Sequence, residues 1–164
     1  MWFLVLVLII LLCMYAYNIV IQSMKYNEEY QILQLKPSQL DEAIIEERNP
    51  IVIETTDVVN DVLLSPVIKD KCKKVRKTEK DVQSVSKARL KAFSYNKDGS
   101  AVVEIITPKH AKMDKKDEEY KSMSIILRKG HVLLLPCMWH FVSDKALTTV
   151  DIHDWQSTIY SFVM

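Results

Sequence analysis

The side chains best suited to metal chemistry are four histidines: His110, His131, His140 and His153. Two of them flank an apolar run in GHVLLLPCMWH, residues 130–140. A non-haem Fe(II) site needs two imidazoles and one carboxylate on one side of the ion, with open positions opposite them. The apolar strand should end at Pro136, and alternation along the next strand then puts Trp139 and His140 on opposite faces. His140 is therefore the first candidate ligand.

This stretch resembles the last metal-binding strand pair of the cupin-like, jumonji-type family. The matching positions are Leu127, Gly130, Leu133, Pro136, Trp139 and His140. The segment NPIVIE, residues 49–54, is also similar to that family's entry strand. The resemblance implies a double-stranded β-helix, which in active members holds Fe(II) and 2-oxoglutarate and hydroxylates or demethylates a protein side chain.

The resemblance also implies a His-x-Asp or His-x-Glu pair some tens of residues before the final histidine. No such pair is present, because His110 is followed by Ala-Lys and His131 by Val-Leu. We therefore expect His140 to be a vestigial ligand, partly buried and hydrogen-bonded inside the barrel, with no metal, no cofactor and no enzyme activity. The alternative is an Fe(II)/2-oxoglutarate-dependent hydroxylase or demethylase with an atypical site, built from His140, either His110 or His131, and a distant carboxylate.

The composition argues against other common chemistries. Only two glycines occur, Gly99 and Gly130, whereas a backbone cradle for nucleotide phosphates needs several residues without Cβ. Three scattered cysteines are too few for a disulfide framework or a zinc knuckle. The 22 basic and 21 acidic residues nearly cancel, so net charge predicts no particular partner.

The first part of the chain is a long apolar segment, residues 2–21. At 1.5 Å per residue, a helix of about twenty residues spans the hydrocarbon core of a bilayer. A cleaved signal peptide would need basic residues before the segment and a small-x-small cleavage site, and neither is present. We expect residues 1–24 to be an uncleaved signal-anchor and residues 25–164 to form one domain. The side chains expected to contact lipid are Trp2, Phe3, Leu4, Leu8, Leu12, Tyr15 and Tyr17.

The orientation of the anchor follows from the charges that flank it. Lys25 and Lys36 come after the segment and no basic residue precedes it, which favours a cytosolic position for the C-terminal domain. Residues 69–80 contain a basic cluster that we expect to be a solvated loop or strand edge. The alternative is an adaptor for anionic membrane surfaces or another polyanion. The basic residues of this cluster are Lys69, Lys71, Lys73, Lys74, Arg76, Lys77 and Lys80.

The pattern of the globular part predicts a mainly-β, α+β fold, an incomplete double-stranded β-helix with one or two short helices near its start. SQLD, residues 38–41, has the form of a helix-capping signature, and the helix should run to about Arg48 before Asn49-Pro50 stops it. A second short helix is expected over 57–64, capped by Thr56 or Asp57. Strands are expected at 30–35, 51–54, 88–95, 101–107, 123–127, 132–135, 139–142, 147–152 and 157–163.

These features together favour a single-pass, membrane-anchored structural or interaction protein without catalytic activity. Metal-poor cupin-like domains on a short N-terminal anchor resemble products of large DNA viruses that have an internal membrane. A minor virion component linking that membrane to the capsid would suit such a chain. The expected partners are the lipid bilayer and neighbouring proteins, including capsid proteins. Nucleic acid is not expected, because no aromatic residue interleaves the basic cluster for base stacking.

Overall fold

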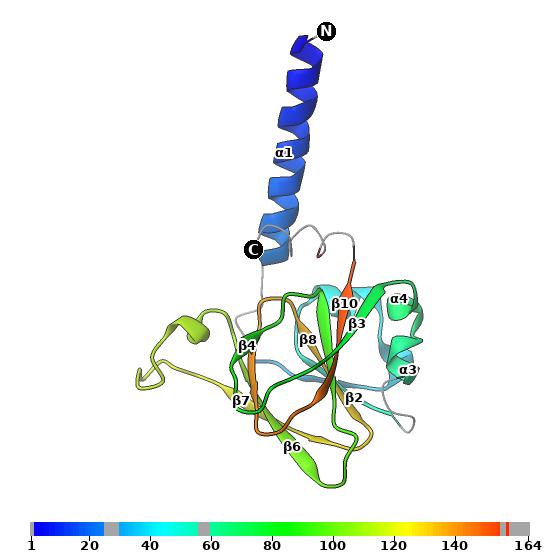
Figure 1. Ribbon diagram of the computed structural model, residues 1–164, viewed down its shortest axis with the longest axis vertical. Coiled ribbons are helices and arrows are strands. Elements are labelled where there is room, and N and C mark those ends of the chain that lie inside the picture. Colours follow the sequence, from blue (N-terminus) through cyan, green and yellow to red (C-terminus); the bar gives the residue numbers. More distant parts are fainter. Residues whose placement is uncertain (1, 25–29, 56–59, 155–156, 158–164) are drawn as a thin grey trace.

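The computed structural model describes residues 2–24, 30–55, 60–154 and 157. The N-terminal helix α1 (Trp2–Met24) has 23 residues and stands clear of the β domain (Figure 1). Its sequence contains neither glycine nor proline and is rich in leucine, isoleucine and valine. The absence of both helix breakers allows an uninterrupted ladder of backbone hydrogen bonds.

The rest of the described chain is mainly β, with short helices, which confirms the predicted α+β class. Two sheets pack face to face (Figure 1). The six-stranded sheet has the order β1 (Leu33–Leu35), β2 (Ile51–Glu54), β8 (His131–Pro136), β5 (Leu90–Ser94), β10 (Thr148–His153) and β3 (Cys72–Lys77). The four-stranded sheet has the order β4 (Ser84–Val85), β9 (His140–Ser143), β6 (Ser100–Ile106) and β7 (Met123–Arg128).

The two glycines lie in turns between the sheets. Gly99 has a φ of +94° and connects β5 with β6, and Gly130 has a φ of +90° and connects β7 with β8. In each case the two strands belong to different sheets, so these turns are corners between sheets. The segment between the strands expected at 88–95 and 101–107 is therefore a corner between sheets and does not close a two-stranded hairpin.

One hydrophobic core fills the space between the two sheets. Inward-facing residues of β2, β5, β6, β7, β8 and β9 form it, including Val52, Phe93, Leu133 and Phe141. Trp139, just before β9, is fully buried in the same core. Each large apolar side chain removed from water contributes about 1.5–3 kcal/mol, so this core is a principal source of stability.

A second core covers the opposite face of the six-stranded sheet. There the outward-facing residues of β2, β5, β8 and β10 meet three short helices: α2 (Glu42–Glu46), α3 (Asn60–Leu63) and α4 (Pro66–Lys69). Ile45 and Ile68 anchor two of these helices and are buried. The domain thus has a helix layer, a six-stranded sheet and a four-stranded sheet (Figure 1).

The start and end of α2 differ from the prediction. Residues 37–39 form a single 3₁₀ turn, and the helix cap is Asp41, whose Oδ1 accepts a hydrogen bond of 2.8 Å from the Ile44 N–H. The helix ends at Glu46 because Arg48 has a φ of +56°, outside the helical region. Pro37 explains the late start, since it forces Lys36 into an extended conformation ahead of the turn.

The other predicted elements agree with the structure within a few residues. Residues 72–77 of the basic segment form β3 at the edge of the six-stranded sheet, which agrees with the expectation of a solvated loop or strand edge. The expected caps at residues 56 and 57 lie outside the described residues. The same is true of the expected strand 157–163 except for Ser157, which is buried and hydrogen-bonded to Asp154 at 2.7 Å.

Candidate functional site

His140 lies on the outer face of the four-stranded sheet. In the pairing of β9 it stands opposite Ile106 on one side and Val85 on the other. Its sequence neighbours Trp139 and Phe141 both belong to the core between the sheets. The expectation that His140 points into the barrel is therefore wrong. Successive side chains of a strand point to opposite faces, so His140 cannot face inward together with Trp139 and Phe141. Burying the two aromatic rings stabilises the fold more than burying the imidazole would.

The surroundings of His140 are otherwise as predicted. The side chain is partly buried, and its Nδ1 atom lies 3.4 Å from Nε2 of Gln83. Loss of solvent lowers the pKa of the imidazole below its ordinary value. His140 is thus a neutral histidine on β9 with the side-chain amide of Gln83 as its neighbour.

The two other histidines of the proposed atypical site have partners of their own. Nδ1 of His110 lies 2.9 Å from the Tyr30 hydroxyl and 3.0 Å from Oγ1 of Thr107. His131 begins β8, and its Nε2 atom is 4.0 Å from a carboxylate oxygen of Glu54. Within the described residues, no three or more His, Cys, Asp or Glu side chains are grouped so that they could hold a metal ion. These donors do not fit an Fe(II) centre, either as the family's triad or in the atypical arrangement.

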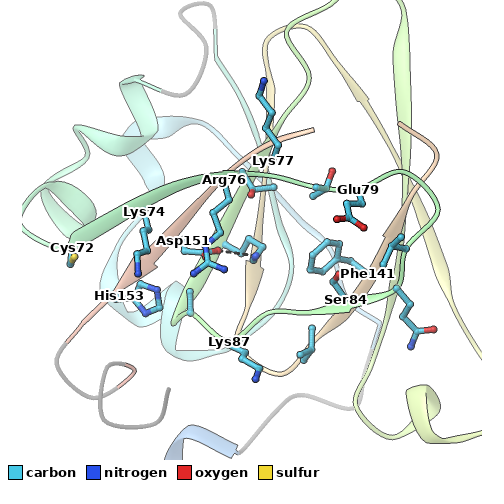
Figure 2. A pocket seen from close by; sticks show the side chains of 17 residues that line it. Cys72, Lys74, Arg76, Lys77, Glu79, Ser84, Lys87, Phe141, Asp151 and His153 are labelled. Carbon is cyan, nitrogen blue, oxygen red and sulfur yellow. Dashed lines mark ion pairs between the residues drawn. The ribbon is translucent and has the colours of Figure 1, made fainter. Parts of the chain in front are cut away.

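The structure instead draws attention to a pocket between the two sheets, at the edge formed by β3 and β4 (Figure 2). Its volume is about 950 Å³. The inner faces of β10 and β5 supply Thr149, Asp151, His153 and Lys91, and β9 supplies Phe141. The remaining wall comes from β3, β4 and the loop between them.

Three charged groups form the floor of this pocket. Asp151 is 4% exposed, and its two carboxylate oxygens lie 2.8 Å from Nζ of Lys91 and 3.1 Å from Nε of Arg76. The arrangement follows from the register, because β10 runs between β5 and β3 and places Asp151 directly opposite Lys91. The Lys91 ammonium group also lies 5.4 Å from the centre of the Phe141 ring, within range of a cation–π contact.

The rim of the pocket is basic. Lys74 on β3 and Lys87 after β4 are exposed and line the opening, together with Glu79. Among the residues that the structure describes, neither lysine has an ion-pair partner. Burial lowers the pKa of His153, and the nearby positive charges of Lys74 and Arg76 lower it further, while Asp151 acts in the opposite direction.

Sequence reasoning did not single out Lys87, Lys91 or Asp151, and it considered His153 only as a metal ligand. A signal was present in the strand TTVDIH, where Asp151 stands between the apolar residues Val150 and Ile152. A charged residue inside a predicted strand must either face solvent or have a buried partner. Whether Asp151 faces solvent or has a buried partner depends on which strand lies beside β10, and the order of residues in the chain does not reveal that neighbour.

The side chains of the basic cluster of residues 69–80 do not all lie on one surface. Lys73 donates hydrogen bonds of 3.0 Å to the carbonyl oxygens of Leu63 and Lys69, at the ends of α3 and α4. Lys71 lies 3.6 Å from the Glu42 carboxylate. Lys74, Arg76 and Lys77 line the pocket, Lys80 forms an exposed ion pair with Asp81, and Lys69 is exposed at the end of α4. Contact of this cluster with a polyanion stays a prediction.

The residues expected to contact lipid all lie on α1. They are between 57% and 87% exposed and are distributed around the helix: Trp2, Phe3, Leu4, Leu8, Leu12, Tyr15 and Tyr17. No helix within the described part of the chain is both long enough and apolar enough to be identified as a membrane span.

Comparison with known proteins adds little to this description. No protein-family model matches the chain, and no curated protein matches it. A structure of RmlC from Streptococcus suis in complex with dTDP-D-xylose is similar, with 12% sequence identity and a TM-score of 0.33. The match covers 53% of this chain and 45% of that chain, so the chain spans less than half the length of the protein it matches.

Proposed function

We propose that this protein is a membrane-anchored structural or interaction protein without catalytic activity. The observation that carries the proposal is α1, a 23-residue helix without a charged side chain, whose described apolar residues are exposed on all sides. A helix of this kind in water leaves a large apolar area unburied, which costs about 25 cal/mol per Å². Length and hydropathy do not identify α1 as a membrane span within the described residues. The proposal rests on its exposed apolar surface, because a bilayer removes the cost of leaving that surface in water.

We further propose that the domain beside the membrane is a cupin-like jelly roll. Its strands from β3 to β10 pair in a nested, antiparallel series: β3 with β10, β4 with β9, β5 with β8 and β6 with β7. A long hairpin of eight strands rolled into two sheets has this pairing, and jelly rolls of this kind occur in capsid proteins, lectins and cupins. Strands β1 and β2 extend one sheet beyond the roll.

The setting that we propose is a virion with an internal membrane, where the domain would link the membrane to the capsid. The domain faces the cytosolic side in this proposal, because Lys25 and Lys36 follow the anchor. Its partners are then the bilayer and neighbouring proteins. The histidine positions support a role without iron chemistry, since the rings of His110, His131 and His140 each have different neighbours.

Extraction of membranes with alkaline carbonate tests the anchor in the full-length chain. We expect the unmodified protein to remain with the membranes, and the variant Leu8→Arg/Leu11→Arg to be released. Arginine near the centre of a membrane helix costs about 2.5–3.5 kcal/mol per residue on insertion scales. The matched control, Leu64→Arg/Ile126→Arg, changes two exposed apolar residues of the domain and should stay membrane-bound. Release of the unmodified protein by carbonate would contradict the proposal.

A further inference from the structure

The inner face of the six-stranded sheet changes character across its width. Val52 on β2, Phe93 on β5 and Leu133 on β8 are inward apolar side chains that fill the core. On β10 and β3 they are polar or charged, and the space in front of them is the pocket of about 950 Å³ (Figure 2). The interior is therefore closely packed on one side and open on the other, with Asp151 and Lys91 at the boundary.

Stability alone does not account for this open and charged region. Removing a carboxylate and an ammonium group from water costs several kcal/mol for each ion, and their mutual attraction rarely exceeds that cost. Apolar residues of similar size at Lys91 and Asp151 would extend the existing core across β5 and β10. Instead the carboxylate of Asp151 pairs with the buried Lys91 inside the pocket and with Arg76, whose side chain reaches the rim. Preorganised charge around a cavity is characteristic of a binding site.

The charges around the pocket favour an anionic ligand. Five lysine and arginine side chains line it, Lys74, Arg76, Lys77, Lys87 and Lys91, and the carboxylates of Asp151 and Glu79 neutralise only part of this charge. Arg76 meets the carboxylate through Nε at 3.1 Å. The guanidinium group has five N–H donors, so most of them are left for another acceptor.

We propose that this pocket binds the phosphate group of a small organic molecule. Lys74, Lys87 and the terminal nitrogens of Arg76 contact the phosphate at the rim, and the uncharged part of the molecule enters between the sheets against Phe141 and Thr149. Phosphate carries up to two charges and several acceptor oxygens, so it can accept hydrogen bonds from donors that converge from two strands. The same group occurs on soluble phosphomonoesters and on phospholipid headgroups, and either source satisfies this chemistry. The inference does not depend on the membrane anchor.

The first experiment measures binding by the full-length chain reconstituted in phosphatidylcholine nanodiscs. Glycerol 3-phosphate is titrated at constant ionic strength, with potassium chloride as the matched salt, and the thermal unfolding midpoint is followed. In a parallel arm the nanodiscs contain phosphatidylinositol 4-phosphate. Ligand that binds only the folded state raises the midpoint. A saturable rise with glycerol 3-phosphate identifies a soluble ligand, and a rise confined to the second arm identifies a lipid headgroup. No rise in either arm overturns the proposal.

The second experiment locates the binding. Cys72 is exposed and lies on the pocket wall, so its rate of alkylation, followed by peptide mass spectrometry, should fall when the pocket is occupied. In Lys74→Gln/Lys87→Gln we expect affinity to fall about tenfold or more, because each charge-assisted hydrogen bond is worth roughly a factor of ten. The control Lys97→Gln/Lys129→Gln removes the same charge from exposed positions elsewhere and should bind as the unmodified chain does. Equal losses in the two variants, or unchanged alkylation of Cys72 at saturation, would overturn the proposed site.

Discussion

The Nζ atom of Lys91 lies 2.8 Å from Oδ1 of Asp151 in the space between the two sheets, and both side chains are almost entirely buried. The two residues come from neighbouring strands, β5 and β10, that are about sixty residues apart in the chain. Their contact exists because the nested strand pairing brings the last described strand alongside the middle of the domain. The polar region of the interior is therefore a consequence of topology.

Removal of one partner of this pair should destabilise the protein strongly. We expect Asp151→Leu to lower the free energy of unfolding by about 3–5 kcal/mol, because Lys91 is then left as an unpaired buried charge. The double variant Asp151→Leu/Lys91→Met leaves no buried charge on either strand and should recover much of the loss. Denaturant unfolding of the full-length chain in detergent measures both values. A double variant as unstable as Asp151→Leu alone would show that the pair is not the cause.

The adjacent residues His140 and Phe141 should respond very differently to truncation. Phe141→Ala creates a cavity in the core between the sheets and should cost about 3–5 kcal/mol of unfolding free energy. His140→Ala removes a side chain from the outer sheet face and should cost about 1 kcal/mol or less, as is usual for substitutions away from the core.

Metal analysis of the same two proteins tests the placement of His140 chemically. We expect the iron content of the purified full-length chain and its turnover of 2-oxoglutarate to be independent of His140. The reason is that the imidazole lies on the opposite sheet face from the pocket and has Gln83 as its neighbour. Stoichiometric iron that is lost in His140→Ala would contradict both the register of β9 and the proposed function.

The two glycines form a matched pair for testing the corners between the sheets. Both have positive φ, so alanine at either position introduces backbone strain of about 1–2 kcal/mol. At Gly99 an added Cβ meets open space, whereas at Gly130 it would come within 2.8 Å of the Thr55 carbonyl oxygen. We therefore expect Gly130→Ala to lower the thermal unfolding midpoint clearly more than Gly99→Ala. Equal shifts would indicate that the backbone at Gly130 moves to accommodate the methyl group.

The local elements could be predicted from the sequence because they depend on neighbours in the chain. Asn49-Pro50 ends the helical region, and Gly99 marks a turn, each through restrictions on its own backbone. The direction of His140 was also within reach. Trp139 and Phe141 are two residues apart, and two large apolar residues at that spacing favour a shared inward face, which puts His140 outside.

The pocket could not be predicted in the same way, because its residues meet only through long-range strand pairing. Lys91 and Asp151 stand side by side only when β10 lies next to β5, and Lys74 joins them only when β3 completes the edge. Single charged residues within otherwise apolar strands were visible in the sequence. Whether these charged residues meet depends on the order of the strands in the sheets, and the local sequence pattern does not specify that order.

The lowered pKa values of His140 and His153 predict how the stability of the protein depends on pH. Burial lowers the pKa of His140 and of His153, so the unfolded chain binds protons more readily than the folded protein at both positions. Stability is therefore unaffected by these groups above their ordinary pKa of about 6.5 and falls as the pH decreases below it, until the folded-state histidines also become protonated. Unfolding free energies measured between about pH 7.5 and 5 should show this fall.

The variant His140→Gln/His153→Gln should show a shallower fall over the same range. Asp154 does not interfere in this window. Burial alone would raise its pKa, but hydrogen bonds from Ser157 and Arg89 outweigh this and lower it. Its contribution to stability is consequently present above the ordinary carboxyl pKa and is lost only at more acidic pH. An identical slope in the double variant would contradict the assignment to these two histidines.

Tyr30 should hold the start of the domain to the sheets. The Tyr30 hydroxyl lies 2.9 Å from Nδ1 of His110 and accepts a hydrogen bond of 3.2 Å from the Thr107 N–H. Its ring stacks on the His110 ring at 5.6 Å. The hydroxyl also donates a hydrogen bond to the carbonyl oxygen of Lys121. Tyr30→Phe keeps the stacking but leaves these three polar groups without this partner, which should cost about 1–3 kcal/mol of unfolding free energy.

Tyr95→Phe is the matched control for this prediction. Tyr95 is also largely buried, and no hydrogen bond of its hydroxyl is found within the described part of the chain. Its contact with Lys145 is through the ring face, at 5.2 Å, and phenylalanine preserves that contact. We therefore expect Tyr95→Phe to change the unfolding free energy by less than about 0.5 kcal/mol. If the two variants lose equal stability, the hydroxyl of Tyr30 does not anchor the N-terminal segment, and the ring contacts with His110 and Trp139 must do so alone.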